Sequence, residues 1–360
     1  MQSNRMLIPL WRYLLWPISL MYGGVMFIRN LLFDKEFLKQ QKFQVPTIVI
    51  GNLNTGGTGK TPFTIYLAQA LLQHNVKNIA ILSRGYKRKS KGFFEVLVPD
   101  PLLYGDEPSE IMLNSPNAKT FVCESRPYGI SQILKYYPET EVVILDDAFQ
   151  HRSLVGGVNI LLTAFNDPFY NDFMLPMGRL RESMKNKNRA DFIICTKANE
   201  ETIMNEGIAR NKVYRGIQPL PGQQLYFTGI EYSKLRDIDM HIGPDLSRLG
   251  TKKILLVTSI ANPEYLYNYI KEFVPDIDHL RFPDHHSFRE KDMLKIVAHY
   301  GNNNDVVIIT TGKDLVKLRQ PENWIHLEDK ALYFIPINVM WQQEEKLRFE
   351  QEIITYVTSN

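Results

Sequence analysis

From residue 45 onward, short apolar runs alternate with segments whose apolar residues recur every three or four positions. Runs rich in Val, Ile and Leu are typical of buried strands, and the longer spacing is typical of helices with one buried face. The pattern predicts strands over residues 46–50, 79–82, 121–123, 142–145, 159–162 and 192–195, and helices over 64–73, 108–113 and 128–136. This alternation favours an α/β fold with a mostly parallel sheet covered on both faces.

The pattern resumes after an interruption at residues 219–222 (PLPG). Residues 224–232 resemble one strand of a ribbon, and a polar stretch follows to Gly250. Further strands and helices are predicted at residues 253–258, 263–273, 290–300, 306–310, 332–335 and 344–356. We therefore expect an N-terminal helix (1–34), a larger α/β domain (35–220), a β-ribbon linker (221–249) and a smaller C-terminal α/β domain (250–360).

The N-terminus departs from this alternation. Residues 6–33 are almost continuously apolar, with Arg12 as the only charge in their first two-thirds. Tryptophan and tyrosine, the residue types of membrane interfaces, occur within this run, and basic residues flank it. No small-residue cleavage site follows the run, which argues against a signal peptide. We expect a membrane-associated helix that lies in, or dips into, a bilayer; the alternative is an amphipathic helix buried in a soluble domain.

Composition narrows the class of protein. The 360 residues include 42 Lys or Arg and 39 Asp or Glu, and the net charge of +3 is too small to indicate a nucleic-acid partner. A hydrophobic content of 44% excludes a disordered or collagen-like chain. The only two cysteines, Cys123 and Cys195, form neither a disulfide framework nor a zinc-ligand pattern, which fits a reducing compartment. Nothing in the sequence predicts a protein partner.

A phosphate-binding loop follows the first predicted strand. Residues 54–61 (NTGGTGKT) match the pattern G-x-x-x-x-G-K-[ST], except that Asn54 replaces the first glycine. Glycines allow backbone N–H groups to surround phosphates, while Lys60 would neutralise the β- and γ-phosphates and Thr61 would bind Mg²⁺. The expected nucleotide-binding residues are Asn54, Thr55, Gly56, Gly57, Thr58, Gly59, Lys60 and Thr61.

Two adjacent carboxylates, Asp146 and Asp147, follow the strand predicted at 142–145. Carboxylates at the end of a buried strand are costly unless they hold a cation, so we expect one of them to bind Mg²⁺ directly or through water. The alternative is a turn that caps the next element. Together with the loop at 54–61, these residues predict a magnesium-dependent user of a nucleoside triphosphate, and they leave its acceptor open.

Other polar clusters suit an anionic substrate. Arg84 belongs to a basic segment after a predicted strand, where a ligand phosphate or solvent would lie. Gln150, His151 and Arg152 continue the double-aspartate strand into the same cleft. The basic run at 179–189 suits an anionic substrate or lipid headgroups, or a solvated helix face.

The remaining candidates are an aspartate and a histidine pair. Asp106 opens a predicted helix, where it either caps the helix or acts at a reaction centre. His285 and His286 follow Asp284 in the second domain, and without a cysteine or third histidine nearby we favour an acid/base or substrate role over metal binding. A satisfied surface pair is the alternative.

Residues 195–199 (CTKAN) are similar to the guanine-reading pattern [NT]-K-x-D. Asn199 stands where that pattern requires Asp, so guanine specificity is not expected. The similarity nevertheless supports a second hypothesis, from a different class of protein: a membrane-recruited P-loop nucleotide switch that phosphorylates no lipid.

Taken in order, the motifs resemble the tetraacyldisaccharide 4′-kinase (lipid A 4′-kinase) family of Gram-negative bacteria. The shared motifs are GNLNTGGTGKTP, SRGYKR, GDEP, LDDAFQHR, LP-x-G-x-LRE, ANP, FPDHHSF and TTGKD. Two positions depart from the family pattern: Ala148 replaces a usual Gly, and Gly312 replaces a common Glu.

The resemblance implies a P-loop kinase domain, a β-ribbon linker and a second α/β domain that closes over the nucleotide. It also implies an enzyme at the cytoplasmic face of the inner membrane, which transfers the γ-phosphate of ATP to the 4′-hydroxyl of a tetraacyldisaccharide 1-phosphate lipid A precursor. A sugar hydroxyl needs a base, and we predict that Asp106 and His285 meet on domain closure to supply it, with His286 as the alternative histidine. The expected catalytic residues are then Asp106, His285 and Lys60.

Overall fold

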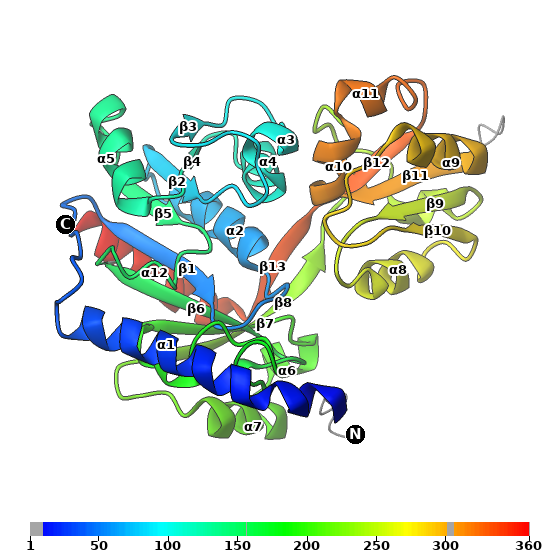
Figure 1. Ribbon diagram of the computed structural model, residues 1–360. Coiled ribbons are helices and arrows are strands. Elements are labelled where there is room, and N and C mark those ends of the chain that lie inside the picture. Colours follow the sequence, from blue (N-terminus) through cyan, green and yellow to red (C-terminus); the bar gives the residue numbers. More distant parts are fainter. Residues whose placement is uncertain (1–9, 156, 301–305, 360) are drawn as a thin grey trace.

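The computed structural model describes residues 10–155, 157–300 and 306–359. Its larger unit is built on a nine-stranded sheet with the order β13-β8-β7-β6-β1-β5-β2-β4-β3 (Figure 1). Every neighbouring pair is parallel except β13–β8 and β3–β4. The strands are β1 (Thr47–Asn52), β2 (Ile79–Ser83), β3 (Phe94–Glu95), β4 (Lys119–Val122), β5 (Val142–Leu145), β6 (Val158–Ala164), β7 (Phe192–Thr196), β8 (Gln224–Tyr232) and β13 (Ile337–Trp341).

Helices cover both faces of this sheet. Alternate residues of the central strands enter different cores, because successive side chains of a strand point to opposite faces. Ile48 of β1 packs with Phe63 and Phe349 on one face, whereas Val49 packs with Ile130 on the other. The flanking helices are α2 (Lys60–Gln73), α4 (Asp106–Asn114), α5 (Arg126–Tyr136), α6 (Glu200–Met204), α7 (Ile208–Ile217) and α12 (Gln343–Thr358). The predicted α/β class with a mostly parallel sheet is confirmed.

The smaller unit contains a four-stranded parallel sheet in the order β10-β9-β11-β12. It lies beyond the far ends of β8 and β13, at the upper right of Figure 1. Its strands are β9 (Lys253–Thr258), β10 (Ile277–Arg281), β11 (Val306–Thr311) and β12 (Leu332–Ile335), and its helices are α8 (Glu264–Lys271), α9 (Glu290–Tyr300), α10 (Gly312–Leu318) and α11 (Pro321–Trp324). Leu255 and Ile308 pack toward α9 and α10, and Leu256 and Ile309 pack toward α8.

The C-terminus differs from the expected division of the chain. β13 pairs antiparallel with β8, and α12 packs its Phe349 and Ile353 against the core beside α2. The last part of the expected C-terminal domain (250–360) therefore belongs to the larger unit. The physical reason is that the apolar face of α12 is buried by the large sheet rather than the small one. β8 and β13 together form the ribbon that joins the two units.

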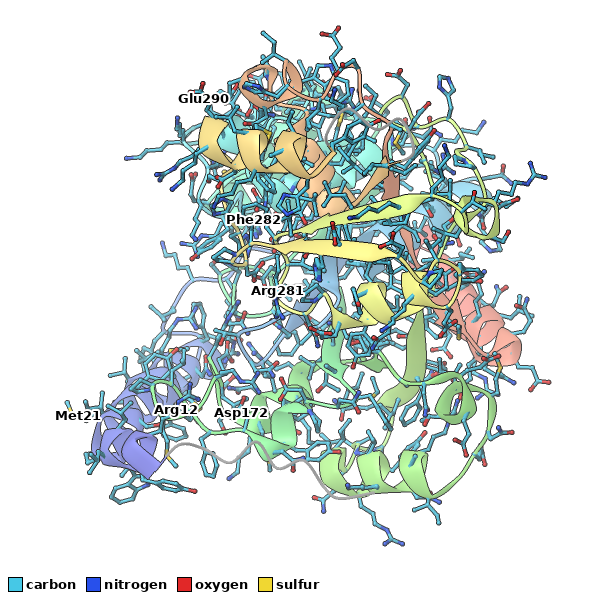
Figure 2. All side chains as sticks on the ribbon, turned by 90° about the vertical axis from the view of Figure 1, so that its right-hand side faces the viewer. Arg12, Met21, Asp172, Arg281, Phe282 and Glu290 are labelled. Atoms are coloured by element: carbon cyan, nitrogen blue, oxygen red, sulfur yellow. The ribbon has the colours of Figure 1, made fainter. Side chains whose placement is uncertain are left out.

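The N-terminal helix α1 (Trp16–Asp34) lies on the outside of the larger unit, preceded by the 3₁₀ turn η1 (Leu10–Leu15) (Figure 1). The helical segment Arg12–Asp34 has 23 residues, and an 18-residue window within it has a mean hydropathy of 1.2, enough in length and composition to cross a membrane. Only Ser19, Asn30 and Phe33 of α1 are buried. Met21 lies on the outward side, with 73% of its surface exposed (Figure 2). The alternative of a helix buried in a soluble domain therefore does not hold.

Four short elements complete the described part of the chain. They are α3 (Pro101–Tyr104), η2 (Phe169–Asn171), η3 (Met184–Arg189) and η4 (Leu246–Leu249).

Candidate active site between the two units

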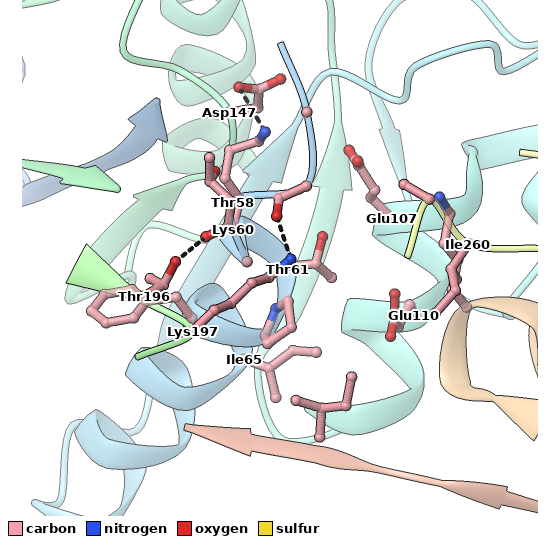
Figure 3. A pocket seen from close by; sticks show the side chains of 18 of the residues that line it. Thr58, Lys60, Thr61, Ile65, Glu107, Glu110, Asp147, Thr196, Lys197 and Ile260 are labelled. Atoms are coloured by element: carbon pink, nitrogen blue, oxygen red, sulfur yellow. Dashed lines mark hydrogen bonds and ion pairs between the residues drawn. The ribbon is translucent and has the colours of Figure 1, made fainter. Parts of the chain in front are cut away.

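The P-loop lies between β1 and α2, at the carboxyl end of the central strand (Figure 3). Gly59 has a left-handed backbone with φ of 81°, which glycine adopts without steric cost, and it directly precedes the first residue of α2. Gly51 has no room for a side chain, because an added Cβ would lie 2.6 Å from the Cβ of Phe149. These local constraints explain why glycines flank the turn that aims backbone N–H groups into the cleft.

Neighbouring segments brace this loop. The Asn52 amide donates to the hydroxyl of Thr58 at 2.9 Å, and the Thr196 hydroxyl donates to the carbonyl of Thr58 at 2.8 Å. Lys197 donates from Nζ to the carbonyl of Gly57 at 2.5 Å (Figure 3). Asn54 is buried, and its Oδ1 has no hydrogen-bond partner among the described residues. The loop is therefore held in shape by side chains from β1 and from the end of β7.

Lys197 is a residue whose position the sequence did not predict. The guanine-like pattern drew attention to Asn199, which instead caps α6 by accepting a hydrogen bond from the Thr202 backbone at 3.0 Å. This helix-capping contact accounts for Asn199 without any base recognition. The signal that could have identified Lys197 is its place directly after a buried strand, at the same sheet edge as the P-loop.

The two adjacent aspartates have different environments. Asp147 lines the cleft, where its Oδ1 lies 3.6 Å from Lys60 Nζ and 3.3 Å from Arg181 Nη1. Partial burial would raise the pKa of Asp147, but the charges of Lys60 and Arg181 outweigh it and hold that pKa below the ordinary value. Asp147 has a left-handed backbone with φ of 46°, and Ala148, where the family usually has Gly, does not. Alanine at position 148 therefore causes no strain.

Asp146 is fully buried behind Asp147 and does not line the cleft. It accepts hydrogen bonds from the hydroxyls of Thr64 at 3.1 Å and Ser83 at 3.2 Å. Burial, followed by the negative charges of Glu107 and Asp147, raises the pKa of Asp146 above the ordinary aspartate value. Of the three predicted magnesium ligands, the structure thus brings Thr61 and Asp147 to the cleft and leaves Asp146 beneath them.

The donor set at the cleft fits Mg²⁺. This ion retains several waters and takes one or two protein oxygens together with phosphate oxygens, so one hydroxyl and one carboxylate suffice. Thr61 and Asp147 are these two groups. No cluster of three or more His, Cys, Asp or Glu side chains that could hold a metal by itself occurs in the described ranges.

The wall beside Asp147 carries the predicted substrate residues Arg84, Gln150 and His151, all of which line the cleft. Gln150 donates to the carbonyl of Asn52 at 2.6 Å. Burial, followed by the positive charges of Arg126 and Arg84, lowers the pKa of His151 to about 4. His151 is therefore neutral at physiological pH, and the positive charge of this wall comes from arginines.

Helix α1 is part of the same wall, because Tyr22 and Arg29 also line the cleft. Tyr22 donates its hydroxyl to the carbonyl of Arg181 at 3.0 Å, and Arg29 donates to the carbonyl of Gln150 at 2.9 Å. Arg152, predicted to face the cleft, does not line it: it donates to the carbonyl of Asn30 at 2.9 Å and pairs with Asp34 at 2.6 Å. Arg152 therefore holds α1 rather than the cleft contents.

The basic run at 179–189 is used mostly within the protein. Arg179 pairs with Asp172 at 2.9 Å and with Asp167, and Arg189 pairs with the buried Glu182 at 2.7 Å. Lys187 is buried and donates to a backbone carbonyl. This run is therefore neither a solvated helix face nor a continuous headgroup site. Within residues 179–189, only Arg179 and Arg181 line the cleft.

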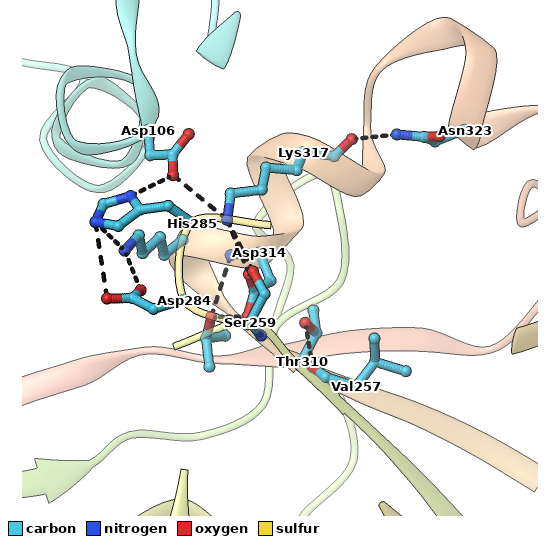
Figure 4. A network of polar contacts seen from close by, with 11 residues as sticks. Asp106, Val257, Ser259, Asp284, His285, Thr310, Asp314, Lys317 and Asn323 are labelled. Carbon is cyan, nitrogen blue, oxygen red and sulfur yellow. Dashed lines mark hydrogen bonds and ion pairs between the residues drawn. The ribbon is translucent and has the colours of Figure 1, made fainter. Parts of the chain in front are cut away.

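The smaller unit, called the second unit below, faces the P-loop with Asp284, His285 and Lys313. His285 Nδ1 lies 3.1 Å from Asp106 Oδ2, across the boundary between the units (Figure 4). His285 Nε2 lies 3.3 Å from Lys313 Nζ, which also pairs with Asp284 at 3.0 Å. The structure therefore brings together Asp106 and His285, as the sequence predicted, although the pair is 179 residues apart in the chain.

His286 lies elsewhere, because it points back into the second unit. Its Nε2 lies 2.9 Å from Asp292 of α9, and its ring stacks on Phe282 at 4.9 Å between centroids. It does not line the cleft. Adjacent side chains point in different directions, and the sequence could not decide which of His285 and His286 faces Asp106.

One cavity of about 1700 Å³ is lined by the P-loop, by Asp147, by the arginines Arg84, Arg179 and Arg181, and by His285. Sites for drug-sized ligands are typically about 300–1,000 Å³, so this cavity has room for a nucleotide and a second substrate together. Its geometry suits phosphoryl transfer, with a phosphate cradle on one side and a histidine–carboxylate pair on the other.

Comparisons with known proteins agree with this geometry. The family model for tetraacyldisaccharide-1-P 4′-kinase (LpxK) matches residues 11–355. A curated tetraacyldisaccharide 4′-kinase of Bacteroides thetaiotaomicron is 40% identical over 96% of this chain and 93% of its own length, and one of Flavobacterium psychrophilum is 38% identical over 97% and 98%.

A solved structure is similar over nearly the whole molecule. The crystal structure of LpxK from Aquifex aeolicus in complex with ATP has a TM-score of 0.75 and 29% identity, covering 96% of this chain and 99% of that one. The family model, the curated relatives and the solved structure each cover nearly the whole chain. The chain belongs to the tetraacyldisaccharide-1-P 4′-kinase family.

Proposed function

We propose that the protein transfers the γ-phosphate of ATP to the 4′-hydroxyl of a tetraacyldisaccharide 1-phosphate lipid A precursor. The observation that carries this proposal is a cavity in which the P-loop faces His285 of the second unit, whose Nδ1 contacts Asp106 of the first. A nucleotide switch has no use for such a pair. The family relatives named as 4′-kinases support the same acceptor.

On the donor side, the backbone of residues 54–59 surrounds the phosphates and Lys60 neutralises charge on the migrating phosphoryl group. Thr61 and Asp147 would hold Mg²⁺, which would offset the negative charge of the phosphates. The carboxylate of Asp147 contacts both Lys60 and Arg181. Nucleotide binding would replace these contacts with contacts to phosphate.

On the acceptor side, the Asp106–His285 pair takes the proton of the 4′-hydroxyl as its oxygen bonds to the γ-phosphorus and the bond to ADP breaks. Asp106 holds Nδ1 of His285, so that Nε2 faces the cavity that Lys313 also lines. Because the two residues come from different units, the base is complete only in the closed molecule, which would limit transfer to water.

The lipid enters from the side of α1. The outward face of α1 would rest in the membrane while its inward face supports Gln150 and Arg181 at the cavity wall. Arg84 makes no ion pair within the described part of the chain and lines the cavity, so it is available to an anionic headgroup. Because ATP is the donor, we place this membrane contact at the cytoplasmic face.

The test is product analysis. Purified protein in mixed micelles is incubated with ATP, Mg²⁺ and tetraacyldisaccharide 1-phosphate, and the lipid is measured by mass spectrometry. A gain of one phosphate that depends on Lys60 supports the proposal. Consumption of ATP without a phosphorylated lipid would instead favour the nucleotide switch.

A further inference from the structure

A buried ammonium group lies behind the Asp106–His285 pair. Lys317 of α10 has only 6% of its side chain exposed, and its Nζ lies 3.4 Å from Asp106 Oδ2, the same oxygen that faces His285 Nδ1 (Figure 4). Lysine is almost never fully buried unless it is paired. This contact crosses from the second unit to α4 of the first, so it exists only while the units are together.

The second unit fixes the position of this ammonium. Lys317 Nζ donates to the hydroxyl of Ser259 at 2.8 Å and lies 3.3 Å from Asp314 Oδ1. Asp314 is itself fully buried and accepts from the Ser259 backbone at 2.8 Å and the Thr311 hydroxyl at 2.9 Å. Contacts with Ser259 and Asp314 therefore fix the ammonium within its own unit. Its remaining polar contact in the described part of the chain is with Asp106 of the other unit.

The charges around the pair are nearly balanced. Three carboxylates (Asp106, Asp284 and Asp314) face two ammonium groups (Lys313 and Lys317), so the cluster carries one net negative charge while His285 is neutral and none once it has accepted a proton. Other titratable groups that face the cluster are Glu107 and Glu110 on α4, Tyr86 and Lys87 on the loop after β2, and Glu322 on α11.

The surrounding charges lower the pKa of Asp106. Burial alone would raise the pKa of Asp106, but the hydrogen bond to His285 and then the charge of Lys317 outweigh burial and hold that pKa below its ordinary value. Without the ammonium, the cluster would be more negative and would bind a proton more tightly.

We propose that Lys317 is a positioning residue of the transfer reaction, which keeps the Asp106–His285 pair unprotonated and aligned when the two units close. It touches no substrate and acts through Asp106. This inference rests on the proposed function, because a base is needed only where a hydroxyl acceptor is deprotonated.

The test compares the pH dependence of kcat in the wild type, Lys317→Gln and Lys317→Arg. Loss of the charge in Lys317→Gln shifts the acidic limb of the profile upward by on the order of one pH unit. Lys317→Arg keeps the limb at its wild-type pH even if the rate falls, and the adjacent cavity of about 80 Å³ gives the larger side chain room. Lys330→Gln, which removes a lysine of the same unit paired with Asp329, is the control and leaves the profile unchanged.

A second readout does not require turnover. The imidazole of His285 is titrated by NMR in the full chain, with its signal assigned by its loss in His285→Ala, and it should protonate at higher pH in Lys317→Gln than in the wild type. If Lys317→Gln does not fold, the double variant Lys317→Gln/Asp314→Asn removes the uncompensated buried carboxylate. The net charge of the cluster then equals that of the wild type, but the lost ammonium contacts Asp106 directly, so a smaller shift in the same direction is expected.

The outcomes separate this inference from the proposed function. A uniform loss of rate at every pH, with His285 titrating as in the wild type, would show that Lys317 only holds the units together and would overturn the inference. If the wild type phosphorylates no lipid at any pH, the proposed function fails, and the NMR titration still decides what Lys317 does to His285.

Discussion

Lys60 and Asp147 face each other at the mouth of the P-loop with 3.6 Å between Nζ and Oδ1, longer than a strong charge-assisted hydrogen bond. Arg181 approaches the same carboxylate at 3.3 Å. Both cations are therefore held loosely by a carboxylate that would itself hold Mg²⁺. Changes at Lys60 and Asp147 should therefore alter phosphate transfer and the Mg²⁺ requirement.

Lys60→Ala removes one positive charge from the site of the migrating phosphoryl group. Loss of one such contact typically lowers kcat by about 10²–10³. The measurements are lipid turnover and, by calorimetry, the affinity for ATP. The control is Lys77→Ala, because Lys77 is an exposed lysine beyond α2. Unchanged turnover in Lys60→Ala would show that residues 54–61 are not the nucleotide site.

Asp147→Asn and Asp146→Asn should affect the Mg²⁺ requirement unequally. Only Asp147 lines the cleft, whereas Asp146 is occupied by the hydroxyls of Thr64 and Ser83. We expect Asp147→Asn to raise the Mg²⁺ concentration for half-maximal activity far more than Asp146→Asn does. Equal shifts in a Mg²⁺ titration would mean that Asp146 also reaches the metal.

His151 predicts how stability depends on pH. Its pKa in the folded protein is about 4, below the ordinary value of 6.5, so the unfolded chain binds the extra proton between these values. The stabilisation from neutral His151 is complete above pH 6.5 and declines as the pH falls toward 4. Thermal unfolding across this range should show a shallower decline in His151→Gln than in the wild type.

Among single residues, the sequence identified chemistry better than orientation. The P-loop, Asp147, Asp106 and His285 were identifiable because each belongs to a short pattern with a physical purpose. The separation of Asp146 from Asp147, and of His285 from His286, depends on which way neighbouring side chains point. Lys317 was not identifiable, because its partners Ser259 and Asp106 are distant in the sequence.

At the scale of elements, α1 has two distinct faces. A narrow stripe that includes Ser19, Tyr22 and Arg29 hydrogen-bonds to the larger unit, and a broad apolar face remains exposed. The docking stripe runs along most of the helix, so α1 remains attached to the protein while its other face is available to a bilayer. This favours a helix that lies in the interface rather than one that crosses the membrane alone.

The two faces of α1 can be tested separately. Met21→Ser, Val25→Ser and Ile28→Ser together remove three exposed apolar side chains, each contributing about 1 kcal/mol of membrane transfer, so vesicle binding should weaken roughly 100-fold. Arg29→Ala alters the inward face and should lower lipid turnover without releasing the protein. ATP affinity serves as the control for both. Full retention of the triple variant on vesicles in a sedimentation assay would refute the anchor assignment.

Most elements were predictable because their patterns are local. The strand at 253–258 and the helix at 290–300 have the predicted bounds, and α2 begins earlier than the apolar spacing indicated because the P-loop leads directly into it. β10 and β13 were missed, since their burial is incomplete and their apolar alternation is weak. Helix α12 packs on the large sheet rather than on the small one. Its amphipathic pattern predicts a buried face but does not indicate which sheet buries that face.

At the scale of the whole molecule, the units meet on both sides of the nucleotide cleft. His285 and Lys317 contact Asp106 on one side, and Tyr265 accepts a hydrogen bond from Asn166 at 3.1 Å on the other. The β8–β13 ribbon joins the units behind the cleft. In the proposed mechanism the chemistry is therefore divided between two units, with the donor site in one and part of the base in the other.

The most direct test of this division is a double-mutant cycle on phosphate transfer to the lipid, using Asp106→Ala, His285→Ala and the double variant, with ATP affinity measured alongside. If the two residues form one base across the boundary, either change alone should cost nearly as much kcat as both together. ATP affinity should stay close to that of the wild type, because neither residue belongs to the P-loop. Losses that multiply, or a fall in ATP affinity that accounts for the lost rate, would contradict the account.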